Sequence, residues 1–206
     1  MKKKYFILII IFLIFTSLFL LNSKRITDHN TSIPVITPTL VPDKIYPIAE
    51  FNQRITKKPF GVYITPKTSP IQPERFQGYH TGVDVEYQDV PTDVPVFAVC
   101  NGDLVLSKWV SGYGGTAVLK CQIDNIDYFI LYGHLKTDSI TKNTKVLKGD
   151  QIAILGTNKS QETDFERKHL HFSVHSKSLD LKGYVQNQND LSVWLDPIYF
   201  LDQINF

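Results

Sequence analysis

The stretch His169-Leu170-His171-Phe172-Ser173-Val174-His175 has the clearest structural pattern in the chain. Successive side chains of a β-strand point to opposite faces, so the histidines and the serine share one face and the apolar residues share the other. The stretch is therefore predicted to be a strand with an apolar back and an imidazole-rich front. A solvated polar face on an edge strand is the simpler alternative, but three histidines on one face are unlikely to arise by chance. His175, furthest along the strand, is expected to be a bystander.

The sequence around this strand has the residue pattern of an all-β domain. From about residue 51, short apolar runs alternate with turn residues, and no segment shows a sustained helical period. Many short strands with hairpin-like turns predict antiparallel sheets. The expected strands are 94–99, 104–109, 116–123, 127–135, 151–155 and 169–175. The segment 183–206 has a less regular pattern and is expected to pack over a sheet edge.

Two further histidine motifs precede the strand. His80 and Asp84 are four residues apart, but Gly82 between them argues against a helix. A curved loop that enters a strand is expected to bring the two side chains together. His134 lies in Tyr132-Gly133-His134-Leu135, at the end of the expected strand 127–135. A histidine at a strand end is by itself weak evidence of function.

Together these residues indicate a metal site. Imidazole nitrogen and carboxylate oxygen both suit zinc, and three protein ligands leave one position open for water, as in catalytic zinc sites. Zinc-bound water has a pKa near 7 and is a nucleophile at neutral pH. Further histidines could move protons or stabilise an oxyanion. His80 and Asp84 are candidate ligands, and spacing alone allows His169, His171 or both to join them.

Seven short motifs, taken in order, resemble the M23 family of metallopeptidases, the lysostaphin-type or LytM-type endopeptidases. The resemblance covers about residues 59–176. The motifs are GYHTGVD (78–84), VPVFA (94–98), NG (101–102), GYGG (112–115), LYGHL (131–135), VLKGDQI (146–152) and HLHF (169–172).

The resemblance implies an antiparallel β-sandwich with a narrow groove that contains zinc. It implies that His80, Asp84 and His171 bind the metal, and that His134 and His169 are a catalytic pair that does not bind it. Members of the family typically cut peptides of bacterial peptidoglycan. The polar stretch 158–168 departs from the family's glycine-rich pattern and is expected to form one groove wall.

The N-terminus predicts a membrane tether. Lys2, Lys3 and Lys4 precede the apolar run 5–21, which is about 26 Å long as a helix and nearly spans a bilayer core. No alanine precedes Ala49, so we favour an uncleaved signal anchor over a cleaved signal peptide, with the bulk of the chain outside the cell membrane. The expected organisation is an anchor (1–22), a Thr- and Pro-rich spacer (23–50) and a peptidase domain (51–206).

Charge and cysteine content fit this location. Residues 51–206 carry 16 Lys or Arg and 17 Asp or Glu, so no basic face is implied and nucleic acid is not an expected partner. Cys100 and Cys121 lie in or beside strand-like segments. Outside the membrane they could form a disulfide, and two buried free thiols are the alternative.

The sequence therefore predicts a zinc-dependent endopeptidase that acts on peptidoglycan peptides. The first alternative is a non-catalytic wall-binding or hydrolase-activating module of the same fold. The second is a zinc hydrolase of another class, such as an amidase of the same polymer.

Overall fold

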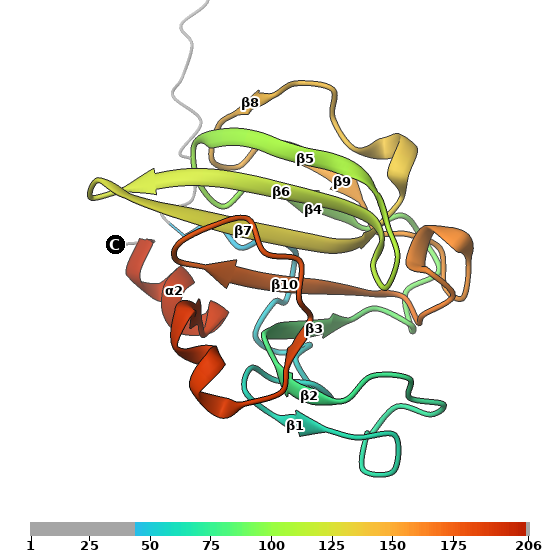
Figure 1. The fold of residues 1–206 in the computed structure, drawn as a ribbon. Coiled ribbons are helices and arrows are strands. Elements are labelled where there is room, and N and C mark those ends of the chain that lie inside the picture. The colour runs from blue at the N-terminus through green and yellow to red at the C-terminus, as the bar shows by residue number, and fades with distance from the viewer. Residues whose placement is uncertain (1–43, 205–206) are drawn as a thin grey trace, which may run out of the picture. The chain divides into compact units, whose positions relative to one another are not determined.

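The structure of the protein is a computed structural model that describes residues 44–204 (Figure 1). The predicted anchor 5–21 and the spacer up to residue 43 lie outside the described residues. Within residues 44–204, no helix is both long enough and apolar enough to cross a membrane.

The described chain is mostly β, as the short apolar runs predict. The strands are β1 (Tyr63–Ile64), β2 (Gly78–His80), β3 (Gly82–Glu86), β4 (Pro95–Phe97), β5 (Gly102–Val110), β6 (Gly114–Ile123), β7 (Ile126–Leu135), β8 (Lys145–Val146), β9 (Gln151–Ile154), β10 (His169–His175), β11 (Tyr184–Val185) and β12 (Trp194–Leu195). The helices are the 3-10 helices η1 (Thr137–Ser139), η2 (Gln161–Thr163) and η3 (Gln188–Val193) and the α-helix α2 (Pro197–Ile204).

The main sheet is antiparallel and has the order β12-β10-β7-β6-β5-β8, with β3 also paired to β10 (Figure 1). Two smaller sheets have the orders β1-β2-β11 and β4-β9. The long strands β6 and β7 form a hairpin that turns at Asp124 and Asn125, whose φ angles are 51° and 63°. Asp and Asn tolerate positive φ better than most residues, which suits them to a tight hairpin turn.

The apolar face of β10 lies in the main core, as the alternating pattern predicts. Leu170, Phe172 and Val174 are fully buried in one cluster with residues of β3, β4, β6, β7 and β9. Ile48 and Phe51 from the N-terminal part of the described chain join the same cluster. The histidine face of β10 is thus backed by a rigid apolar layer.

A disulfide joins Cys100 to Cys121, with 6.3 Å between the Cα atoms. Cys121 lies on β6 opposite Gly102, the first residue of β5. The bridge therefore joins the segment just before β5 to the neighbouring strand β6. Of the two states left open by the sequence, the structure has the bonded one.

The C-terminal segment contains a helix that the sequence analysis did not predict. In α2, Pro197, Phe200 and Leu201 are buried, and the latter two belong to the main core cluster. Asp196 accepts a hydrogen bond from the backbone N–H of Ile198 at 2.9 Å, which caps the start of the helix. The helix has only eight residues, about two turns, which is too short to produce a recognisable helical period.

Candidate metal centre and its surroundings

His80, Asp84 and His171 converge at one buried point. His80 Nε2 lies 3.2 Å from His171 Nδ1, His171 Nδ1 lies 3.1 Å from Asp84 Oδ1, and His80 Nε2 lies 3.4 Å from the same oxygen. Among residues 44–204, these three form the one group of His, Cys, Asp or Glu side chains that could hold a metal ion. The predicted pairing of the two motifs is therefore observed.

Strand pairing explains this convergence of distant residues. Antiparallel pairing of β3 with β10 places Asp84 directly opposite His171. His80 ends β2 and reaches the same point because the chain turns sharply through Thr81 and Gly82. A Cβ atom at Gly82 would lie 2.4 Å from the carbonyl oxygen of Phe172, so only glycine allows β3 to approach β10 this closely. The curved loop expected between His80 and Asp84 is thus a turn between two strands.

The three atoms suit a tetrahedral metal ion. Zinc–ligand bonds of about 2.0–2.1 Å place two tetrahedral ligand atoms about 3.3 Å apart, close to the three observed separations. His80 Nδ1 lies 3.2 Å from the carbonyl oxygen of Pro59, and donation of its N–H to that oxygen leaves Nε2 free as a ligand atom. His171 Nε2 is buried and has no hydrogen-bond partner among the described residues.

His134 and His169 lie together beside this group. Their ring centroids are 4.1 Å apart. His134 Nδ1 lies 3.1 Å from the carbonyl oxygen of Thr163, and His169 Nδ1 lies 2.8 Å from that of Arg167. Donation from both Nδ1 atoms to these oxygens makes both Nε2 atoms proton acceptors. His134 has a φ of 62°, an uncommon backbone conformation for a residue other than glycine, and such residues often occur at functional sites.

Burial controls the charge of these rings. It lowers the pKa of His134 to about 3, with Asp84 opposing the shift. Burial, together with Arg167 and His134, also holds the pKa of His169 well below its usual value. Burial alone would raise the pKa of Asp84, but His169, His80 and Arg167 hold it well below its ordinary value. The site therefore combines an ionised Asp84 carboxylate with neutral imidazoles at His134 and His169, the forms that bind metal and accept protons.

A cavity of about 300 Å³ gives access to the site. Its lining includes Asp84, His171, His134 and His169, as well as Glu166 and Arg167 from the polar stretch 158–168. This stretch thus forms part of the groove wall, as expected. The hydroxyl of Tyr113, which also lines the cavity, is buried without a hydrogen-bond partner among the described residues.

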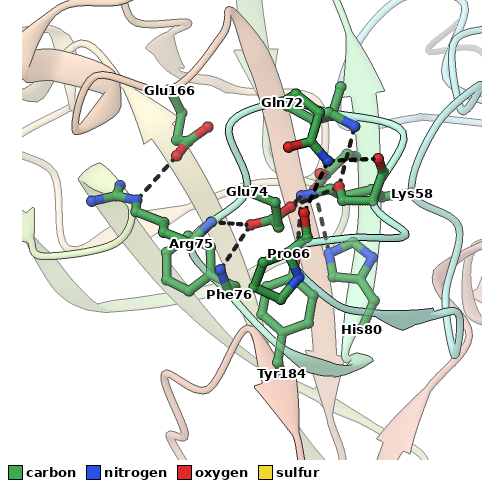
Figure 2. A network of polar contacts seen from close by, with 12 residues as sticks. Lys58, Pro66, Gln72, Glu74, Arg75, Phe76, His80, Glu166 and Tyr184 are labelled. Carbon is green, nitrogen blue, oxygen red and sulfur yellow. Dashed lines mark hydrogen bonds and ion pairs between the residues drawn. The ribbon is translucent and has the colours of Figure 1, made fainter.

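Two buried charged groups near the site were not singled out from the sequence. Arg167 bonds to Asp84 and Glu86. Lys58 lies 2.5 Å from Glu74 and donates to the Tyr184 hydroxyl at 3.1 Å, beside His80 (Figure 2). Their sequence context is ordinary for exposed charges, and no local pattern indicates that they are buried.

His175 lies apart from the cavity. Its Nδ1 accepts hydrogen bonds from the backbone N–H groups of Lys177 and Ser178 at 3.2 and 3.0 Å. Its ring contacts Trp194 edge to face, with 4.7 Å between centroids. These contacts close the turn after β10, which agrees with the expectation that His175 is a bystander.

The fold and site define a mostly antiparallel β-protein with a buried His-Asp-His candidate metal centre. Residues 78–183 match the family model of peptidase family M23, and the chain belongs to this family.

Two solved structures show the extent of the similarity. The catalytic domain of the antimicrobial peptidase lysostaphin from Staphylococcus simulans has 23% sequence identity and a TM-score of 0.51, over 74% of this chain and 95% of that one. LytU has 26% identity and a TM-score of 0.50, over 73% of this chain and 85% of that one. The resemblance inferred from the seven motifs is confirmed.

Proposed function

We propose that the protein is a zinc-dependent endopeptidase that hydrolyses peptide bonds in bacterial peptidoglycan. One observation supports this most directly: three candidate zinc ligands meet at one point, and two of them, Asp84 and His171, line one cavity with His134 and His169. Membership of peptidase family M23 supports peptide cleavage. The choice of peptidoglycan follows what is typical of that family.

His80, Asp84 and His171 would hold Zn²⁺ through Nε2, Oδ1 and Nδ1. Three protein ligands leave a position open for water. When bound, the ion would polarise the scissile carbonyl and lower the pKa of water. His169 stays outside this ligand set because its Nε2 lies 3.5 Å from Asp84 Oδ2, whereas the atoms of His80 and His171 meet at Oδ1.

His134 and His169 would handle the protons. Both Nε2 atoms are acceptors in the neutral state, so either ring can take the proton of the attacking water as general base. The protonated ring can then donate to the oxyanion or return the proton to the leaving amine. The carbonyl groups of Thr163 and Arg167 keep both rings in the required orientation throughout.

The proposed location is the outer face of the cell membrane. The apolar run 5–21 would anchor the chain and the spacer would hold the domain near the wall. The Cys100–Cys121 disulfide supports an oxidising compartment. Cleavage of the run as a signal peptide would instead release a secreted enzyme.

The direct test is digestion of purified peptidoglycan, with products identified by mass spectrometry. The expected result is release of peptides with newly formed amino and carboxyl ends, which stops with chelator and resumes with Zn²⁺. The variant His171→Ala should neither retain zinc nor release products, while His175→Asn serves as the matched control.

The same experiment separates the alternatives. Products cut at the bond between sugar and peptide would identify an amidase. A folded, zinc-loaded domain that binds the polymer but releases nothing from any wall type would favour the non-catalytic module.

A further inference from the structure

We propose that Arg167 is a positioning residue that makes Asp84 bind the metal through one oxygen, with Glu86 as its anchor. This inference rests on the proposed zinc site. It concerns a residue in the stretch 158–168, where the chain departs from the glycine-rich pattern of its family.

The two carboxylate oxygens of Asp84 have different surroundings. Oδ1 faces the candidate ligand nitrogens of His80 and His171 at 3.4 and 3.1 Å. Oδ2 points away and accepts a hydrogen bond from Arg167 Nη2 at 2.8 Å. His169 Nε2 is also near Oδ2, at 3.5 Å, but it is an acceptor while Nδ1 carries the proton. Arg167 therefore provides the donor that fixes Oδ2.

Arg167 is itself firmly held. Its Nε lies 3.1 and 2.9 Å from the two carboxylate oxygens of Glu86, and its Nη2 lies 2.6 Å from Oε1. Only 3% of the Arg167 side chain and 10% of the Glu86 side chain are exposed. Glu86 also lies 3.6 Å from Lys57 Nζ. One guanidinium group thus joins two buried carboxylates in a fixed geometry.

The register of the sheet explains why one guanidinium can reach both. Asp84 and Glu86 are two residues apart on β3, so their side chains share a face. His169 pairs with Glu86, and Arg167 lies two residues before His169, where β10 begins. The planar fork of arginine can bond to two carboxylates at once, which the single ammonium of lysine cannot reproduce.

Arg167 affects both parts of the site. Its side chain sets the orientation of a candidate ligand, and its carbonyl oxygen lies 2.8 Å from Nδ1 of the proposed catalytic His169. Substitution of the side chain leaves the carbonyl in place. Metal binding is therefore the property that a change of side chain should alter first.

The test compares the whole chain with the double variant Arg167→Gln/Glu86→Gln, which removes the guanidinium without leaving Glu86 charged and unpaired. Lys168→Gln is the matched control, because its ammonium bonds to the carbonyl groups of Val90 and Thr92 and not to Asp84. Arg167→Lys is included because it retains the charge and loses the fork, and folding is checked by circular dichroism. Zinc dissociation constants come from competition with a chromophoric chelator, and Co²⁺-substituted protein reports ligand number by its visible absorption.

The double variant should bind zinc about 10–100-fold more weakly, as expected for loss of a partner of a metal ligand. Its cobalt bands should weaken as Oδ2 becomes free to coordinate. Arg167→Lys should bind zinc more weakly than the parent chain, and Lys168→Gln should match it. If the double variant does not fold, the zinc affinity of Arg167→Lys tests the inference in its place. Unchanged zinc affinity and an unchanged cobalt spectrum in the folded variant would overturn this inference and leave the proposed function standing. A parent chain that binds neither zinc nor cobalt would overturn both.

Discussion

The rings of His134 and His169 lie 4.1 Å apart, and the Nδ1 atom of each faces a backbone carbonyl. The two histidines come from different strands, β7 and β10, and both reach the cavity beside the candidate metal centre. Neither histidine contributes an atom to the His80, Asp84 and His171 group, so the proposed function assigns proton transfer and metal binding to different residues.

This separation leads to a prediction for His134→Ala and His169→Ala. Each variant should retain zinc, since the three ligands are intact, and should lose about 10²–10⁴-fold in peptidoglycan cleavage, the usual contribution of a general acid or base. Metal analysis and initial cleavage rates measure the two properties independently. Full activity in either folded variant would remove that histidine from the mechanism.

The buried Lys58–Glu74 pair should matter to stability. Lys58→Met would leave the Glu74 carboxylate buried without its cation and should cost about 3–5 kcal/mol in the free energy of unfolding. Burial tends to raise the pKa of Glu74, but its bonds to Lys58 and to the N–H of Phe76 lower it overall. Denaturant unfolding measures the loss.

The matched double variant Lys58→Met/Glu74→Gln tests the origin of that loss. Glutamine can still accept the N–H groups of Arg75 and Phe76, each 2.9 Å from Glu74 Oε1. The double variant should therefore recover much of the stability. An equally unstable double variant would show that lost packing around Lys58, and not an unpaired charge, causes the effect.

Loss of the disulfide should destabilise the domain without altering its site. Cys100 and Cys121 are 21 residues apart in the sequence, and a closed loop of this size contributes about 3 kcal/mol through the unfolded chain. The variant Cys100→Ser/Cys121→Ser should unfold at lower denaturant concentration and bind zinc as before. Reductant should shift the unfolding midpoint of the parent protein and leave that of the variant unchanged.

His175 should make stability dependent on pH. Burial lowers the pKa of His175; Asp180 opposes the shift, and Lys182 and Lys177 add to it. In the unfolded chain the same ring binds a proton near pH 6.5. The unfolded state therefore holds more protons below that pH, and stability should fall as the pH falls from about 6.5 toward the folded pKa.

The variant His175→Asn isolates this effect, because its carbonyl oxygen can still accept the N–H groups of Lys177 and Ser178. Unfolding midpoints at pH 7 and pH 5.5, measured with chelator so that zinc release does not contribute, should drop more for the parent than for the variant. Equal drops would assign the pH dependence to other groups.

Local patterns in the sequence predicted most of the fold, and the choice of His171 over His169 as a candidate ligand came from the family resemblance. The alternation in 169–175 depends on strand geometry alone, and β10 has the predicted bounds. Longer strands such as β6 and β7 were found within two residues of their ends. The two-residue strands and α2 were missed because so few residues produce no period.

The buried charged residues around the site could not be predicted from local sequence patterns. Arg167 and Lys58 look like surface residues in sequence, and they are buried because Asp84 and Glu86 neutralise Arg167 and Glu74 neutralises Lys58. Arg167 meets Asp84 across 83 positions, and Lys58 meets Tyr184 across 126. Such contacts exist only after the strands have paired, so no short window contains them.

Asp164 shows how the walls of the groove are linked mechanically. Its Oδ2 atom accepts bonds from Arg75 Nη2 and from the N–H of Gly112, both at 2.8 Å, while Arg75 Nε also bonds to Glu166 at 3.1 Å (Figure 2). The Asp164 carboxylate therefore joins three segments of the chain, 65–77, 111–113 and 158–168. Each of these segments contributes residues to the lining of the cavity, so the bonds of Asp164 tie the walls of the cavity to one another.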